Sequence, residues 1–492
     1  MRPIIRNAWA STLQAAISGI LMFFLYRSLL DSIGVDGMGV WSVILATTSS
    51  ARITELGLSG SVVKFVAKYL ALDSKLIASN LIQTATISLG SFIGVILVGI
   101  YFPLQWLLPY FLPATAIHEA ASLLPFALGS LWLTTLTGVA QAALDGCQRT
   151  DLRGLASVLN NLLMLVLATW LAPLYGLTGL AYSQIITAGL LLITTWLLLR
   201  SQLKQLPILP YSWNLSLFRE MVLYGLSFQA TSVAAMLFDP VTKLLLSSYG
   251  NLSLVGYYEM SSRMIGQLRG LMIAAQQVLV PVIADSQEKK PEKVLEIYKD
   301  IYQAQVYISI PFYLGIAALT PVISILWIGY YENDFVCFTL LLTLGWFLNG
   351  FIAPAYFVNL GIGELRWNMI SHLVIGAGNA GLGILFGMHL GGYGVIIAWV
   401  VSLALGSLIV VLAFHINHKI NLQELIPPGS IELIFACGFG TWVCWLAYHY
   451  LPSGMDKLWI AIACLVIYSA SIAISVWRHP LRSRLLLLMA GR

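Results

Sequence analysis

Charge is the scarcest property of this sequence. Only 10% of its 492 residues are Asp, Glu, Lys or Arg, while 59% are hydrophobic, and the mean hydropathy is +0.85. A soluble domain carries about 25% charged residues, so this chain has too few to cover a water-facing surface. The composition therefore excludes a soluble globular protein, offers no basis for a nucleic-acid partner, and makes lipid the solvent.

Several motifs are missing as well. The five cysteines form no CxxC pair, so the sequence predicts no disulfide or metal framework, and Cys437 and Cys444 are interpreted as small apolar fillers. There is no GxxxxGK[ST] loop, which indicates that the chain is not an ATPase on its own. The longest hydrophilic segments, residues 200–220 and 284–300, are too short to form a separate domain on either face.

What the sequence does have is a series of apolar runs of about 20 residues, the length of a helix that spans a bilayer. We predict an all-α polytopic membrane protein with about fourteen transmembrane helices. The first run is too long for the apolar region of a signal peptide and is interpreted as a retained helix. The predicted helices are residues 9–30, 37–58, 77–102, 120–143, 154–173, 177–199, 221–246, 255–281, 302–327, 335–359, 368–389, 393–414, 431–451 and 457–477.

The basic residues give the orientation. Of the 26 Lys and Arg residues, twenty fall on one side of the predicted helices, and the opposite side holds Lys457 alone. Because basic loops stay in the cytoplasm, we expect both termini to be cytoplasmic and the protein to lie in a bacterial inner (plasma) membrane. The twenty are Arg2, Arg6, Lys64, Lys68, Lys75, Arg149, Arg153, Arg200, Lys204, Arg219, Lys289, Lys290, Lys293, Lys299, Arg366, Lys419, Arg478, Arg482, Arg484 and Arg492.

Two halves of the chain resemble each other at a nearly constant offset, although chance similarity among glycine-rich helices is the competing interpretation. An even number of helices precedes the second copy, so the halves are parallel repeats that can rock against each other as a transporter does. We expect two pseudo-symmetric six-helix lobes, residues 1–200 and 201–430, and two appended helices with a cytoplasmic tail, residues 431–492. The matched pairs are Gly39–Gly256 and Arg52–Arg269 at an offset of 217, and Gly146–Gly361, Gly176–Gly391 and Gly179–Gly394 at 215.

Eight ionisable residues lie at predicted membrane depth, where charge is costly and marks a functional site by default. All are on the first two helices of each half. Arg52–Glu55, Asp239–Lys243 and Glu259–Arg263 have the spacing for pairing on one helix face, which leaves Arg27 and Arg269 without a local partner. The eight are Arg27, Arg52, Glu55, Asp239, Lys243, Glu259, Arg263 and Arg269.

These charges have two interpretations. Five are positive and three negative, and the surplus favours a cationic, water-filled cavity for an anionic head group such as a diphosphate, because guanidinium binds phosphate through paired hydrogen bonds. The cavity would then bind substrate through Arg52, Arg269, Arg263, Arg27 and Lys243. The other interpretation is mutual pairing with snorkelling near the helix ends. The carboxylates Asp239, which precedes Pro240, Glu55 and Glu259 are candidate ion-coupling sites or simple salt-bridge partners.

Short motifs carry a resemblance to a known family. Gly34-Val35-Asp36-Gly37-Met38-Gly39-Val40-Trp41, then Glu55-Leu56-Gly57-Leu58 and Val63-Lys64-Phe65-Val66-Ala67, frame the second predicted helix. With residues 239–243 and Val255-Gly256-Tyr257-Tyr258 of the second half, they resemble the polysaccharide-transporter (O-antigen flippase-like) branch of the multidrug/oligosaccharidyl-lipid/polysaccharide (MOP) exporter superfamily.

The resemblance implies a flippase that alternates between inward and outward openings. Its substrate would be an oligosaccharide repeat unit on undecaprenyl diphosphate, moved from the cytoplasmic to the outer leaflet. We expect no catalysis and no cofactor, with H⁺ or Na⁺ as the candidate coupling ion. Expected partners are this lipid-linked oligosaccharide, membrane lipids, and a glycan polymerase with its assembly proteins. The alternatives are a cation-coupled multidrug or metabolite exporter of the same superfamily and, more remotely, a membrane glycan polymerase or ligase.

Overall fold

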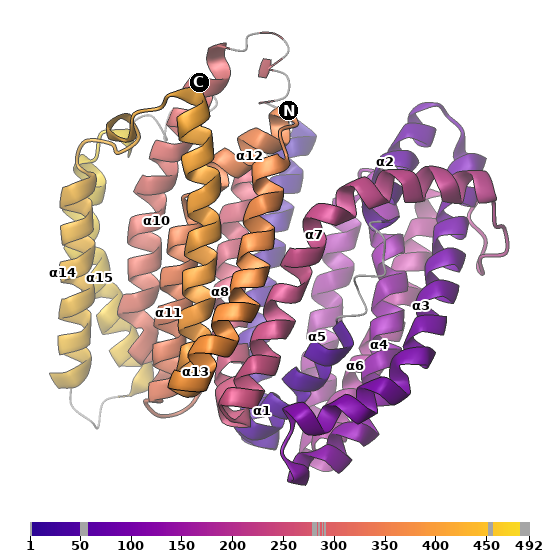
Figure 1. The fold of residues 1–492 in the computed structure, drawn as a ribbon, viewed down its shortest axis with the longest axis horizontal. Helices are drawn as coiled ribbons and strands as arrows, with labels where there is room; N and C mark the ends of the chain where they lie inside the picture. Colours follow the sequence, from indigo (N-terminus) through magenta and orange to yellow (C-terminus); the bar gives the residue numbers. More distant parts are fainter. Residues whose placement is uncertain are drawn as a thin grey trace. The chain divides into compact units, whose positions relative to one another are not determined.

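The chain folds into long helices, as the apolar runs predict (Figure 1). The structure is a computed structural model that describes residues 2–49, 58–277, 292–450 and 456–482, with isolated positions between 283 and 289. No strand occurs in these residues. The α-helices are α1 (Arg2–Ser49), α2 (Leu58–Ala71), α3 (Lys75–Phe111), α4 (Ala114–Gly146), α5 (Thr150–Tyr175), α6 (Leu177–Gln202), α7 (Leu215–Tyr249), α8 (Leu252–Gln277), α10 (Glu292–Trp327), α11 (Asn333–Gly350), α12 (Ala353–Ile362), α13 (Arg366–His418), α14 (Ser430–Tyr450) and α15 (Lys457–Arg478).

The number of membrane spans agrees with the prediction of about fourteen. Within the described ranges, nine helices are long and apolar enough to cross a membrane, and the bent α11–α12 pair makes a tenth. Non-helical residues at Gly34 in α1 and Gly391 in α13 each divide one of these helices into two segments. The long helices α7 and α8 bring the count to fourteen. The protein is therefore a multi-pass, all-α membrane protein.

Two features of the helices depart from the prediction, and one predicted boundary lies outside the described residues. The predicted helix 335–359 is two helices bent by 42°, because Pro354 starts α12 and cannot continue the hydrogen bonding of α11. The predicted helix 37–58 is described only to Ser49, so its end lies outside the described residues. Helix α2 was not predicted, because it is short and lysines interrupt its apolar face.

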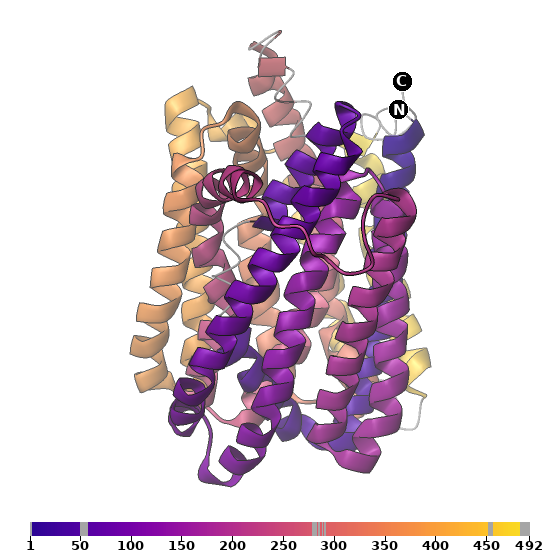
Figure 2. The ribbon, with the colours of Figure 1, turned by 90° about the vertical axis from the view of Figure 1, so that its right-hand side faces the viewer.

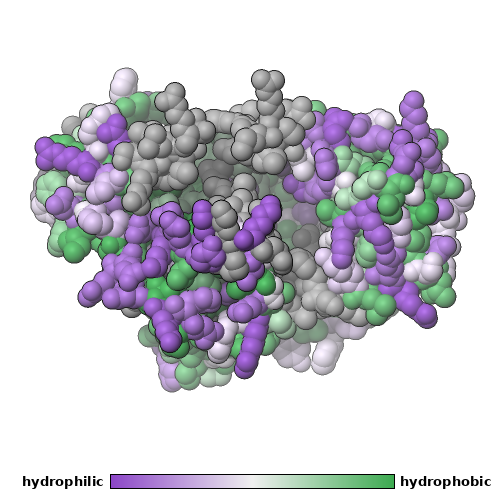
Figure 3. All heavy atoms as spheres, turned by 90° about the horizontal axis from the view of Figure 1, so that it is seen from above, coloured by the Kyte–Doolittle hydropathy of each residue, from purple (hydrophilic) through white to green (hydrophobic). Residues whose placement is uncertain are grey.

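Helix α2 is amphipathic. Val62 and Val66 are buried against the neighbouring helices, while Lys64 and Lys68 are exposed. Seen from the end at which α2 lies, the molecule shows gathered hydrophilic side chains (Figure 3). Helices α3 to α6 run alongside one another, with α4 packed against α3 and α6 (Figure 2).

Backbone geometry confirms the repeat. Gly176, between α5 and α6, has φ 59° and ψ −136°, and Gly391, at the break in α13, has φ 63° and ψ −148°. A Cβ on Gly179 would lie 2.1 Å from the carbonyl oxygen of Leu171, and a Cβ on Gly394 would lie 2.1 Å from that of Phe386. Leu171 and Phe386 are themselves 215 residues apart, so both halves make the same glycine-dependent helical hairpin.

The chain forms two compact units, Met1–Glu259 and Met260–Arg492. The lobes at residues 1–200 and 201–430 were defined by the sequence repeat, and they stay a prediction. In the second unit, α14 and α15 pack on α10 around a buried cluster that contains Cys444, Cys464 and Tyr468. Cys437 is buried in a neighbouring apolar cluster, and both predicted filler cysteines are free thiols.

A side chain of α14 supplies a hydrogen-bond donor that the backbone of α10 lacks. Pro321 has no N–H, so the carbonyl of Ala317 one turn earlier loses its helical donor. The indole Nε1 of Trp445 on α14 donates to that oxygen at 3.1 Å. In lipid no water is available to replace such a partner, so Trp445 contributes directly to the stability of α10.

We expect Trp445→Phe to destabilise the protein by about 1 kcal/mol, because the Ala317 carbonyl loses its donor. In a Pro321→Ala background the restored N–H satisfies that carbonyl, and Trp445→Phe should cost much less. Thermal denaturation in detergent measures both costs. The control is Trp442→Phe, whose indole is exposed on the same helix. Equal costs of Trp445→Phe in the two backgrounds would contradict this account.

Candidate functional site

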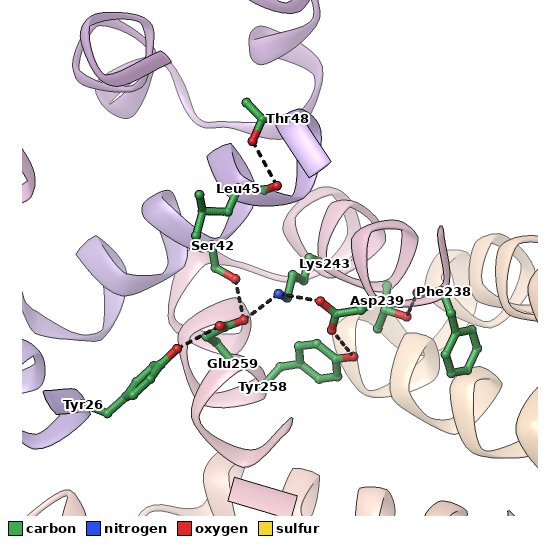
Figure 4. Close-up of polar contacts among 10 residues, drawn as sticks. Tyr26, Ser42, Leu45, Thr48, Phe238, Asp239, Lys243, Tyr258 and Glu259 are labelled. Carbon is green, nitrogen blue, oxygen red and sulfur yellow. Dashed lines mark hydrogen bonds and ion pairs between the residues drawn. The ribbon is translucent and has the colours of Figure 1, made fainter. Parts of the chain in front are cut away.

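A lysine lies between two carboxylates in the first unit (Figure 4). Lys243 Nζ is 2.6 Å from Asp239 Oδ2 and 2.6 Å from Glu259 Oε2. The Lys243 and Glu259 side chains are only 6% and 7% exposed, whereas that of Asp239 is 47% exposed. The predicted Asp239–Lys243 pair on α7 is thus confirmed, and Glu259 of α8 joins it through a contact that the sequence did not reveal.

Hydroxyl groups donate to both carboxylates. Tyr26 Oη and Ser42 Oγ of α1 donate to Oε1 and Oε2 of Glu259, each at 2.9 Å. Tyr258 Oη donates to Asp239 Oδ1 at 3.0 Å. The two carboxylates and the one ammonium group of this trio carry a formal net charge of one negative unit. Lys243, which was predicted to bind an anionic substrate, is therefore paired with the carboxylates of Asp239 and Glu259.

Removing the lysine should be severe. We expect Lys243→Ala to destabilise the protein by about 3–5 kcal/mol, because two carboxylates then face each other without a counter-ion. Adding Glu259→Gln should recover part of the loss, and thermal denaturation in detergent measures both effects. The control is Lys68→Ala, which breaks an exposed 3.0 Å ion pair with Glu220 and should cost little, because solvent screens an exposed pair. Similar losses for Lys243→Ala and Lys68→Ala would refute the buried-pair interpretation.

Next to this network, α1 and the start of α8 cross at repeat-equivalent positions. A Cβ on Gly39 would lie 2.1 Å from the carbonyl oxygen of Leu252, and a Cβ on Gly256 would lie 2.4 Å from that of Val35. The two contacts are reciprocal at an offset of 217, the offset predicted for the repeat. At the same offset, Ser253 Oγ donates to Asp36 and Ser42 Oγ to Glu259. We call residues 35–39 with 252–256 the α1–α8 crossing. The two helices can approach this closely only because Gly39 and Gly256 have no side chain.

In the second unit, Arg269 of α8 is held without a carboxylate. Its guanidinium carbon lies 3.6 Å from the ring centroid of Trp346 on α11. Its Nη2 donates to Asn349 Oδ1 at 3.4 Å. Asn349 Nδ2 in turn donates to Ser407 Oγ at 2.8 Å, which fixes the amide orientation. No ion pair to Arg269 occurs in the part of the chain that the structure describes.

This arrangement preserves the anion-binding capacity of Arg269. Stacking on an indole holds the guanidinium plane without neutralising its charge. A guanidinium has five N–H donors, and the amide of Asn349 takes one of them at the long end of hydrogen-bond distance. The contacts that orient the Arg269 side chain are thus with neutral groups.

The other predicted cations have different outcomes. The prediction that Arg27 has no local partner was wrong. Its Nε lies 3.3 Å from Asp31 Oδ2, one turn along α1. That error came from ending the predicted helix at residue 30, which placed Asp31 in a loop. Arg263 lies on α8 with an exposed side chain. The predicted pair of Arg52 and Glu55 lies outside the described residues.

Solved structures of several transporters share this arrangement of spanning helices. A lipid II flippase MurJ structure in an inward closed conformation has a TM-score of 0.74 and 15% identity, covering 99% of this chain and 100% of that one. An inward-facing multidrug resistance MATE family transporter of the MOP superfamily has a TM-score of 0.71 and 16% identity, covering 83% and 98%. The Vibrio cholerae MATE transporter VcmN gives 0.62 and 15%, covering 86% and 98%.

At these identities the likeness establishes the fold alone. The family comes from sequence: the chain belongs to the family of polysaccharide biosynthesis proteins, whose model matches residues 72–331, slightly more than half of its length. A sequence comparison with curated proteins gives no match. The resemblance noted from the motifs is thereby confirmed.

Proposed function

We propose that this protein is a flippase for undecaprenyl-diphosphate-linked oligosaccharide or polysaccharide repeat units. It would move them from the cytoplasmic to the outer leaflet of a bacterial inner membrane, with both termini in the cytoplasm. Membership of a polysaccharide biosynthesis family supports a glycan substrate, and the MOP fold supports a transport role by alternating access. The role involves no chemical step and no cofactor. A glycan polymerase and assembly proteins would use the product.

The observation that carries this proposal is Arg269. A cation inside a membrane protein is costly unless it has a purpose, and here it is oriented by Trp346 and Asn349. A diphosphate matches the paired donors of a guanidinium. Arg52, its repeat equivalent, is the second residue that we assign to the head group, on sequence alone.

A cation-coupled exporter of the same superfamily is the second candidate. The observation in its favour is the Asp239–Lys243–Glu259 trio, in which carboxylates outnumber the amine. Asp239 is the half-exposed carboxylate and therefore the more accessible to H⁺ or Na⁺. In the flippase the same trio would serve as the coupling site, with Glu55 as a further candidate.

Ligand-induced stabilisation tests the head-group assignment. Purified protein in detergent would be heated with undecaprenyl-diphosphate oligosaccharide, or with the same glycan on undecaprenol without phosphate. A ligand that binds only the folded state raises the denaturation midpoint, so we expect a shift for the diphosphate and little for the phosphate-free lipid. Equal shifts would refute diphosphate recognition. Stabilisation by organic cations alone, with efflux of a cationic dye from proteoliposomes, would establish the exporter instead.

A further inference from the structure

The first unit has an apolar groove of about 410 Å³ on α3 and α4. Its α3 wall is one helix face between Gly94 and Phe102, and its α4 wall is Leu128, Gly129 and Trp132. No ionisable acid or base other than the Tyr101 phenol lines it. Neither Arg269 nor any residue of the Lys243 network lines the groove.

Glycines and a hydrogen-bonded indole shape this groove. Trp132 Nε1 donates to the backbone oxygen of Gly90 at 2.8 Å, so the polar edge of the indole is satisfied and its ring serves as an apolar wall. A Cβ on Gly94 would lie 3.3 Å from Trp132 Nε1, and a Cβ on Gly129 would lie 3.1 Å from Ile185 Cδ1. Larger residues at either glycine would crowd these neighbours and change the wall of the groove.

The surroundings determine the kind of occupant. Both α3 and α4 are long and apolar enough to span the membrane, and the Val98 side chain at the mouth of the groove is exposed. The groove therefore opens into hydrocarbon. Its volume is more than ten times the roughly 30 Å³ that one water molecule takes in the liquid, so it fits a chain segment of many carbons and has no charge for a head group.

We propose that this groove holds the polyprenyl tail of the lipid-linked substrate, an inference that rests on the proposed function. An amphiphile whose head crosses through protein keeps its tail in the bilayer, so the tail must pass along a lipid-facing surface of the same protein. The faces of Trp132 and Phe102 supply broad apolar contact for an isoprenoid chain, and Gly94 and Gly129 add no side chain to the groove.

Photolabelling tests the groove without requiring transport. Full-length protein would be reconstituted in vesicles of phosphatidylethanolamine and phosphatidylglycerol with undecaprenyl diphosphate that carries a diazirine in its tail. We expect labelled peptides from residues 94–102 and 128–132. Unlabelled undecaprenyl diphosphate should compete for the label, and the same amount of added dioleoyl phosphatidylglycerol should not.

Two matched variants make the test specific. Val98 and Val95 lie on the same helix with 76% and 73% exposure, but only Val98 lines the groove. Val98→Trp should lose most of the label, whereas Val95→Trp should keep it, and neither exposed site threatens folding. Full labelling of Val98→Trp, or equal competition by phospholipid, would overturn the proposal. Labelling of a protein that transports nothing would sustain the groove and refute the flippase function.

Discussion

Arg269→Ala is expected to abolish transport of a lipid-linked diphosphate while leaving the fold intact. A hydrogen bond to a charged group contributes about 1.5–3 kcal/mol, which corresponds to roughly 10- to 100-fold in head-group affinity. Arg269→Lys should keep part of the activity, because an ammonium restores the charge but not the paired donors. The measurement is flipping of fluorescent substrate in proteoliposomes, with denaturation midpoints to verify folding.

The matched control for Arg269 is Arg366. It also lies over an indole, 5.4 Å from the ring centroid of Trp367, but its side chain is exposed at the start of α13. Arg366→Ala should therefore transport normally. Native transport by Arg269→Ala, or an equal loss in both variants, would remove Arg269 from the site.

A disulfide across the α1–α8 crossing should arrest transport reversibly. Ser253 donates a hydrogen bond to Asp36 there, so cysteines at these two positions would lie close enough to oxidise. Alternating access requires helices that close one side to separate in another state. We expect oxidised Asp36→Cys/Ser253→Cys protein to be inactive and a reductant to restore it.

The control disulfide joins α3 to the α6–α7 loop, two segments that we expect to stay in contact during transport. Ser79 Oγ of α3 donates to the backbone oxygen of Gln205 in the α6–α7 loop at 3.0 Å. The backbone N–H groups of Tyr211 and Ser212 donate to Gln83 Oε1 and also hold that loop on α3. Oxidised Ser79→Cys/Gln205→Cys protein should remain active. Full activity of the cross-linked α1–α8 crossing would show that it stays closed throughout the cycle.

The fold was largely predictable because membrane helices are encoded locally. Runs of apolar residues at bilayer length gave nearly every helix, and the interruption at residues 31–36 anticipated the break at Gly34. Helix α2 was not predicted because its apolar face is short and is interrupted by Lys64 and Lys68. The bend between α11 and α12 occurs at Pro354, a proline that the sequence shows inside the predicted helix 335–359, whereas the angle of 42° is not contained in a hydropathy pattern.

The candidate site was predictable only where its contacts are local. Asp239 and Lys243 are one helical turn apart, so their pairing followed from spacing. The Ser42–Glu259 hydrogen bond joins residues 217 apart, and only the repeat offset hinted at it. No local signal placed Trp346 and Asn349 around Arg269, because side chains from a separate helix meet it only after folding.

The most direct test of the flippase account is net movement of the head group across a bilayer. Purified protein in proteoliposomes would receive fluorescent undecaprenyl-diphosphate oligosaccharide in one leaflet, and a membrane-impermeant quencher would report its arrival in the other. The account predicts movement by the native protein that an Arg52→Ala, Arg269→Ala double variant of verified folding loses. Movement no faster than in protein-free liposomes, under a proton or sodium gradient of either direction, would contradict it.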